Sequence, residues 1–280
     1  MADDQGRVRI EEGVVFGTGG DRELRCDVFH PPALAGPAPG VLLVHGGAWR
    51  GGDRLQLRGY GVLLGRRGYV CVATEYRLAQ DAAWPAQIED VKCALRFMRA
   101  NAASLGIDAD RIVVQGNSAG GHLALLAAGT PDDPRFEGTG GHEGVSSAVC
   151  AAIAIYPPTL LAHGSMPRGA VPAFALSDAA DAALAAEASP ATYFGPQFPP
   201  TMLIHGTGDQ LVPVAASELA YEALTAAGVP CELHIYPEQP HSFDADPVFG
   251  RRCADEMLFF LDRYAKPAGR SPSLGTAAAS

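Results

Sequence analysis

The chain has 280 residues, of which 48% are hydrophobic and 19% charged. This composition supplies a large core and excludes a disordered chain. The formal net charge of −10 at pH 7 would repel a phosphate backbone, so nucleic acid is not an expected partner. The N-terminus shows no apolar stretch after a basic start, and no apolar run approaches the ~18 residues of a membrane span. We therefore expect a cytoplasmic protein with no membrane partner.

The first elements are predicted to form an antiparallel hairpin at the edge of a sheet. Residues 7–16 and 24–30 alternate roughly between apolar and polar side chains, and a glycine-rich turn at 17–21 separates them. A proline-rich segment then leads into the apolar run 41–44. Such a short run between turn residues fits a strand that is buried on both faces.

Further along, strands alternate with helices. We expect strands at 69–74, 111–115, 149–156, 201–205 and 232–236, and helices at 85–103, 118–128, 214–227 and 252–265. This alternation implies βαβ crossovers and a mainly parallel sheet with helices on both faces. The predicted fold class is therefore α/β, an open and doubly wound sheet with an antiparallel N-terminal hairpin.

Two stretches do not fit the alternation, and they shape the predicted domain organisation. Residues 132–147 are polar and glycine-rich, and residues 157–200 are alanine-rich and interrupted by prolines. A loop as long as the second is usually a lid or a binding loop, with an inert surface excursion as the alternative. We expect one domain over 1–265, with 157–200 as a small lid-like insertion, and a disordered tail over 266–280.

The segment Gly116-Asn117-Ser118-Ala119-Gly120 carries the strongest functional signal. It matches GxSxG and lies between an apolar strand and an apolar helix, where such a turn lifts a serine hydroxyl above the sheet. The following helix directs its N-terminal amides toward the hydroxyl, where they can stabilise negative charge. A glycine-rich turn with a capping serine is the alternative. A phosphate-binding loop is disfavoured because no Gly-Lys-Ser/Thr follows.

The run His45-Gly46-Gly47-Ala48-Trp49 directly follows the strand at 41–44. Consecutive residues with small side chains let backbone N–H groups face a cavity, which is what an oxyanion hole requires. The alternative is a plain turn after a strand.

A nucleophilic serine needs a base and an orienting carboxylate. Asp209 follows the strand at 201–205, and His241 follows the strand at 232–236, so both lie where doubly wound folds keep their sites. The rival acids are Glu238, Asp244 and Asp178. Glu238 and Asp244 are better interpreted as solvated loop charges, and Asp178 lies in the lid-like insertion. His45 and His205 are expected to brace their loops by hydrogen bonding.

Metal and disulfide chemistry find little support in the sequence. The six cysteines form no CxxC pair, and no HExxH or comparable zinc spacing occurs. We expect reduced, mostly buried cysteines, no metal and no organic cofactor.

With HGGAW, GNSAGG, HGTGD and PHSF in that order, the sequence resembles the α/β-hydrolase superfamily and, within it, bacterial esterases related to hormone-sensitive lipase. The segments EYRLA at 75–79 and WPAQIED at 84–90 are similar to that family's stretch between oxyanion loop and nucleophile. The likeness covers about residues 39–264. The chain has Ala48 after HGG where the lipase-like group commonly has HGGG, and HGTGDQLVP in place of DPLxDE. In this it looks more like the branch with feruloyl and acetyl-xylan esterases, arylformamidases and some peptidase-like members.

The resemblance implies roles for individual residues. Ser118 would be the nucleophile, His241 the base and Asp209 its orienter. The amides of Gly47, Ala48 and Ala119 would form the oxyanion hole. Trp49 and the segment 157–200 are the candidates for lining the acyl or alcohol pocket.

These residues predict a serine carboxylesterase that hydrolyses short-chain or aryl esters through an acyl-enzyme, with a small-molecule ester as its partner. A histidine base predicts activity that rises through roughly pH 6 to 8. Amide, formamide or carbamate hydrolysis and acyl transfer are alternatives on the same triad, and a non-catalytic small-molecule receptor is a more distant one. Composition leaves the formation of a homo-oligomer open.

Overall fold

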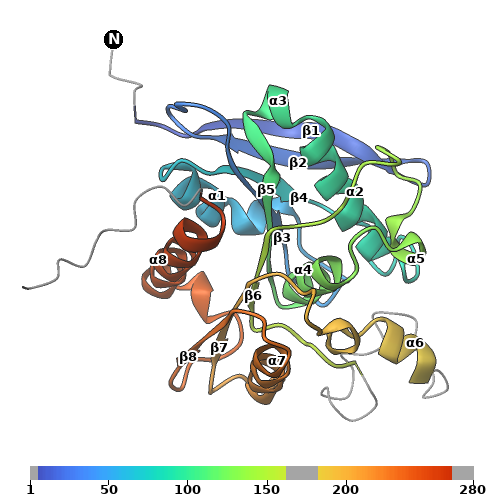
Figure 1. Cartoon of the computed structure of the whole chain (residues 1–280), viewed down its shortest axis with the longest axis vertical. Helices are drawn as coiled ribbons and strands as arrows, with labels where there is room; N and C mark the ends of the chain where they lie inside the picture. Colours follow the sequence, from blue (N-terminus) through green and yellow to red (C-terminus); the bar gives the residue numbers. More distant parts are fainter. Residues whose placement is uncertain (1–5, 162–181, 267–280) are drawn as a thin grey trace, which may run out of the picture.

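The computed structural model describes residues 6–161 and 182–266, and its centre is one eight-stranded sheet (Figure 1). The strands are β1 (Arg9–Gly19), β2 (Arg22–His30), β3 (Ala38–Val44), β4 (Val70–Thr74), β5 (Ile107–Asn117), β6 (Ala151–Ile155), β7 (Thr201–Gly206) and β8 (Cys231–Tyr236). Their order is β1-β2-β4-β3-β5-β6-β7-β8. Strand β2 pairs antiparallel with β1 and with β4, and all other pairs are parallel. The predicted edge hairpin and mainly parallel sheet are confirmed.

Helices cover both faces of this sheet. They are η1 (Arg54–Leu57), α1 (Arg58–Gly65), α2 (Ala86–Ala100), α3 (Ala102–Leu105), α4 (Ala119–Gly129), α5 (Pro134–Glu137), α6 (Ala182–Glu187), η3 (Pro190–Tyr193), α7 (Ala215–Ala226), η4 (Phe243–Ala245) and α8 (Pro247–Tyr264). Helices α1 and α8 pack on one face, and α2, α4 and α7 pack on the other (Figure 1). The sheet is therefore doubly wound, as predicted.

Strand β3 shows why the central strands read as unbroken apolar runs. All seven of its residues are buried. Because side chains alternate across a strand, Leu42 and Val44 enter the core under α2 and α4, whereas Val41 and Leu43 enter the core under α1 and α8. Helix α4 is likewise apolar on nearly all sides and buried along its length, which fixes its N-terminus against the sheet.

The sequence prediction missed η1 and α1, and it started α8 five residues late. Helix α1 contains three glycines, which lower helix propensity, and one of them is sterically required: a Cβ on Gly61 would lie 2.8 Å from the ring of Phe29. At α8, the Asp246 side chain caps the helix by accepting from the amide of Val248 at 2.8 Å, and Pro247 is the first helical residue.

The predicted domain boundaries stay a prediction. The described residues contribute to a single sheet and its two helical layers. Residues 162–181 of the predicted lid-like insertion lie outside the described part of the chain. The insertion's residues after position 181 form α6 and η3. Residues 267–280 of the predicted tail also lie outside it.

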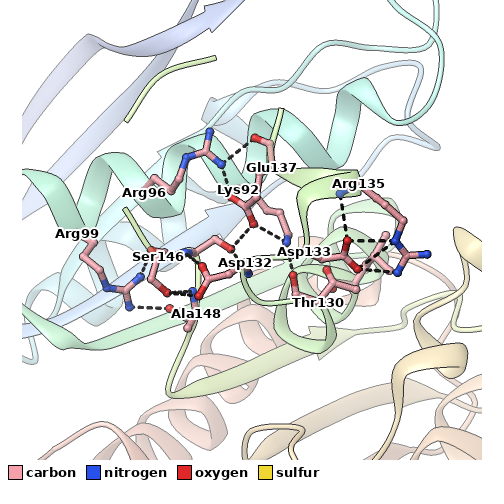
Figure 2. A network of polar contacts seen from close by, with 12 residues as sticks. Lys92, Arg96, Arg99, Thr130, Asp132, Asp133, Arg135, Glu137, Ser146 and Ala148 are labelled. Carbon is pink, nitrogen blue, oxygen red and sulfur yellow. Dashed lines mark hydrogen bonds and ion pairs between the residues drawn. The ribbon is translucent and has the colours of Figure 1, made fainter. Parts of the chain in front are cut away.

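The polar stretch 132–147, expected as a loop, is tied to α2 by buried ions (Figure 2). Lys92 is fully buried, and its Nζ donates to Glu137 Oε1 at 2.8 Å and to the carbonyl of Thr130. Arg96, 2% exposed, bonds to the other carboxylate oxygen of Glu137 and to the carbonyl of Gly141 at 3.1 Å. One carboxylate therefore neutralises two buried cations.

Replacing Glu137 by Ala should lower the free energy of unfolding by about 3 to 5 kcal/mol, because Lys92 and Arg96 would remain buried without their anion. Urea unfolding followed by far-UV circular dichroism measures the change. Arg9→Ala, which breaks an exposed ion pair with Glu11, is the matched control and should have a far smaller effect. Equal effects of the two substitutions would contradict this account.

Candidate active site

Ser118 lies on a sharp turn between β5 and α4. Its backbone has φ 54° and ψ −119°, an unfavourable region for a residue with a side chain, and its amide donates to the carbonyl of Ile155 at 2.8 Å. The flanking glycines are required by space. A Cβ on Gly116 would lie 2.1 Å from the carbonyl oxygen of Gly120, and a Cβ on Gly120 would lie 2.0 Å from that of Val44. The GxSxG pattern thus reflects steric necessity at this turn.

The structure brings together the three side chains that the sequence singled out. Ser118 Oγ is 2.9 Å from His241 Nε2, and His241 Nδ1 is 2.6 Å from Asp209 Oδ2. Asp209 follows β7 and His241 follows β8, so the carboxyl ends of parallel strands deliver both side chains to the edge where β5 delivers the serine. When Nδ1 donates to the carboxylate, Nε2 is free to accept the proton of the hydroxyl.

The surroundings of Asp209 keep its carboxylate ionised. Its side chain is fully buried, which by itself opposes ionisation. Hydrogen bonds from His205, from His241 and from the amide of Val212 outweigh that cost and hold the pKa of Asp209 well below its usual value. The other carboxylate oxygen, Oδ1, accepts from the amides of Leu211 and Val212 at 2.8 Å each.

His205 and His45 brace their loops, as predicted. His205 Nδ1 lies 2.8 Å from Ser217 Oγ, and its Nε2 lies 2.9 Å from the carbonyl of Val212 and 3.3 Å from Asp209 Oδ2. His45 contacts the carbonyl of Gly46 through Nδ1 at 2.7 Å and stacks on Tyr76. Neither side chain touches Ser118 in the contacts found among the described residues.

The loop after β3 lies against the serine turn. A Cβ on Gly46 would be 3.0 Å from the carbonyl oxygen of Asn117, so a side chain here would push the serine turn away. Gly47 and Ala48 are exposed, have φ values of 113° and 51°, and line the same cavity as Ser118. For their N–H groups, residues 6–161 and 182–266 provide no hydrogen-bond acceptor. Ala119, the third predicted donor, is the first residue of α4, where amides have no partner within the helix.

Trp49 does not fit the predicted contact with substrate. Its side chain is 1% exposed and packs edge-on against His122, with ring centroids 5.1 Å apart. It belongs to the core beneath α2 and α4 and does not line the cavity beside Ser118. The loop turns at this residue, so its indole points into the core while Gly47 and Ala48 face solvent.

Ser118 and His241 open into a cavity of about 1060 Å³. Its apolar walls come from η1, α1, the loop after β7, η4 and the start of α8, and they include Leu57, Val62, Leu63, Leu211, Ala245 and Pro247. A large, mostly apolar cleft with a few polar groups is the usual form of a small-molecule site.

Four polar residues in the cavity lining form a hydrogen-bonded group that the sequence did not indicate: Tyr60, Asn117, Tyr156 and Asp244. The interpretation of Asp244 as a solvated loop charge is wrong, because its carboxylate accepts hydrogen bonds from the other three side chains. Two of the four could have been suspected from their position, since Asn117 precedes the serine and Asp244 follows His241 by three residues.

Within the described ranges, 6–161 and 182–266, no group of three or more His, Cys, Asp or Glu side chains is placed to hold a metal ion. The helices in those same ranges include none with the length and apolar character needed to span a membrane.

A doubly wound sheet whose carboxyl edge carries a serine turn, a histidine and an aspartate in hydrogen-bonded sequence defines an α/β-hydrolase fold. The chain belongs to the BD-FAE family, whose model matches residues 26–224. The resemblance to bacterial esterases related to hormone-sensitive lipase is thereby confirmed.

Two curated relatives come from Mycobacterium tuberculosis. Esterase LipQ is 34% identical over 89% of this chain and 61% of its own length. The probable carboxylic ester hydrolase LipM is 35% identical over 87% of this chain and 58% of its own length. The chain thus spans about three fifths of the length of these relatives.

Solved structures match over nearly the whole chain. Esterase 2 of Thermogutta terrifontis, phosphonylated by sarin, superposes with a TM-score of 0.82 at 26% identity and covers 94% of this chain and 97% of that one. A truncated carbohydrate esterase from gut microbiota has the same TM-score at 23% identity, covers 94% and 99% of the two chains, and shares the fold.

Proposed function

We propose that this chain is a serine carboxylesterase that hydrolyses short-chain or aryl carboxylic esters through an acyl-enzyme intermediate. The observation that carries the proposal is the line of hydrogen bonds from Ser118 through His241 to the ionised Asp209, at the wall of an apolar cavity. The esterase names of LipQ and LipM support it.

In the proposed reaction, His241 takes the proton of Ser118 as Oγ attacks the ester carbonyl. The negative charge that develops on the carbonyl oxygen is stabilised by the amides of Gly47, Ala48 and Ala119. The imidazolium then protonates the leaving alcohol, and the acyl group stays on the serine. His241 next activates water, which releases the acid and restores the hydroxyl. Asp209 holds Nδ1 protonated throughout and stabilises the imidazolium.

The apolar walls favour alkyl or aryl groups over charged ones. Thermogutta terrifontis esterase 2, at 25% identity and a TM-score of 0.80, has a butyrate-bound structure, which supports a short acyl chain as the first one to test. The cavity of about 1060 Å³ also has room for a larger alcohol or aryl portion.

A p-nitrophenyl ester series of increasing chain length, with the matched anilides, tests the reaction class. We expect turnover of the short esters and much slower turnover of the anilides. Faster anilide than ester cleavage would favour the amidase alternative, and added alcohol acceptors would reveal acyl transfer. Peptide mapping after treatment with a fluorophosphonate should find the label on Ser118, and folded protein that takes up no label would favour a non-catalytic receptor.

The pH profile should reflect one titrating group. Because the pKa of Asp209 is depressed in the folded protein, its contribution to stability is present above the unfolded value of about 3.9 and is lost only as pH falls through the lower folded pKa. The carboxylate of Asp209 therefore stays ionised near neutral pH and does not shape the profile there. We expect log(kcat/KM) to rise with a slope of one and level off between about pH 6 and 8. A slope of two would contradict a permanently ionised Asp209.

We further propose a cytoplasmic location. All six cysteines are free, as expected in a reducing compartment. Burial also raises the pKa of Cys26, Cys231 and Cys253 to about 12, so these thiols resist oxidation.

A further inference from the structure

Asp244 is the centre of a polar cluster at the wall of the cavity. Its Oδ2 accepts from the hydroxyl of Tyr60 at 2.7 Å and from Asn117 Nδ2 at 2.6 Å, and its Oδ1 accepts from the hydroxyl of Tyr156. The four side chains come from α1, the end of β5, the turn after β6 and η4. We call them the Asp244 cluster. Three of its members, Tyr60, Asn117 and Tyr156, are at most 6% exposed.

The cluster contacts the reacting residues at two points. Asn117 directly precedes Ser118, and its amide is fixed at both ends: Nδ2 donates to Asp244 and to the Tyr156 hydroxyl at 3.0 Å, and Oδ1 accepts from Gln115 at 2.6 Å. The ring of Tyr156 packs against the imidazole of His241, with centroids 4.6 Å apart and planes inclined by 55°. The cluster therefore restrains the serine turn and the base together.

The backbone of Tyr156 shows that this arrangement is maintained against strain. Its φ of 41° is unusual for a bulky residue and is energetically unfavourable. Its amide donates to the carbonyl of Ile204 at 2.7 Å, and its hydroxyl is held by Asp244. These bonds place the ring over the imidazole.

All three donors point at one carboxylate, which is the pattern of an ionised aspartate between neutral tyrosines. Burial, and next the charge of Asp244, raises the pKa of both Tyr60 and Tyr156 well above the usual value, so both hydroxyls keep their protons. The ring of Tyr156 contacts the imidazole of His241, and the charge of Asp244 lies behind that ring, at the Tyr156 hydroxyl. A nearby aromatic face and a nearby negative charge both favour an imidazolium over a neutral imidazole. That form arises when the base takes the serine proton.

We propose that Asp244 is a positioning residue of the active site: through Asn117 and Tyr156 it aligns the serine turn with His241, and its charge favours the imidazolium formed during attack. This inference rests on the proposed esterase function. Among the described residues, the other charged or titratable groups around His241 are Asp209 and His205 behind Nδ1, Glu238 in its own loop, and Arg58 and Arg251 in the cavity lining. Arg58 is paired with Glu12. Substitution of Asp244 leaves all of these groups in place.

Asp244→Asn removes the charge while nearly preserving the shape of the side chain. We expect kcat to fall about 10-fold with little change in KM, because a small misalignment of reacting groups slows the chemical step. The midpoint of the rising limb of the pH profile should also move to lower pH, by about half a unit, since a negative charge near the imidazole is lost. Tyr156→Phe should lower kcat without moving the midpoint, because the charge of Asp244 remains.

Asp262→Asn is the matched control. Asp262 on α8 accepts from the buried Tyr69 at 2.6 Å, so this substitution also removes a charge from a tyrosine–aspartate pair, but away from the cavity. It should leave kcat and the midpoint unchanged. A lower kcat in Asp244→Asn with an unmoved midpoint would reduce Asp244 to a structural role and overturn the proposal. A change confined to KM would make it a substrate contact and would overturn it too.

The rate of fluorophosphonate labelling of Ser118, followed against pH, separates this inference from the proposed function because it needs no ester substrate. Slower labelling of Asp244→Asn than of wild type, with a displaced midpoint, supports the inference even if the true substrate is an amide. Equal labelling of the two proteins overturns the inference while leaving the nucleophilic role of Ser118 intact. Absence of labelling in wild type overturns the proposed function itself.

Discussion

Ser118→Ala should lower kcat for p-nitrophenyl butyrate by on the order of 10⁵- to 10⁶-fold, because no other group can form the acyl-enzyme once the hydroxyl is gone. KM should change little, since the walls of the cavity are untouched. Alanine at this position keeps the Cβ and the turn, so the thermal midpoint should stay close to that of wild type. A sensitive fluorogenic ester at high enzyme concentration gives the residual rate, which the oxyanion amides alone can sustain above the uncatalysed reaction.

Ser104→Ala provides the matched control for this experiment. Ser104 is exposed on α3, where its hydroxyl donates to the carbonyl of Asn101 at 2.9 Å. The substitution removes the same atom from a site outside the cavity and should leave turnover unchanged. Comparable turnover by Ser118→Ala and wild type would reject the nucleophile assignment.

The sequence was sufficient to predict those features whose structural cause lies within a short stretch of chain. Ser118 could be placed because the GxSxG pattern lies within five residues of chain, where Gly116 is required by the backbone of Gly120 itself. The requirement for Gly120 comes from the distant carbonyl of Val44, but the pattern already contains that glycine. Asp209 and His241 needed one further step, that loops after consecutive parallel strands meet at one edge, and the pairing of β7 with β8 satisfies it. The alternation of strands and helices indicated the doubly wound sheet in the same way.

Features that depend on distant contacts could not be predicted. The indole of Trp49 enters the core because a loop turns there, and nothing in HGGAW indicates that direction. In the sequence, Asp244 looks like an ordinary surface charge. Only the fold shows that it accepts a hydrogen bond from Tyr60, 184 positions away. The glycines of helix α1 weakened its helical signal in the sequence. One of them, Gly61, leaves room for the ring of Phe29 from strand β2. In each case the partner that decides the outcome lies far away in the sequence.

Asp209→Asn should lower kcat by about 10⁴-fold, the second large effect we expect. The cause is a change in the tautomer of the His241 imidazole. The amide oxygen of Asn can still accept from the amides of Leu211 and Val212, so the loop should keep its shape. Its NH₂ group then faces His241 Nδ1, which must become the acceptor. The ring proton moves to Nε2, and the imidazole can no longer accept the proton of the serine.

Asp246→Asn is a suitable control because it removes a nearby charge while asparagine preserves the cap of α8. It should retain wild-type activity, whereas Asp209→Asn should be almost inactive at an unchanged thermal midpoint. Nitrogen-15 NMR of histidine-labelled protein would report the ring proton of His241 on Nδ1 in wild type and on Nε2 in Asp209→Asn. Loss of activity below about 10-fold, or an unaltered tautomer, would show that Asp209 does not orient the base, and the role of the buried carboxylate would have to be reassigned.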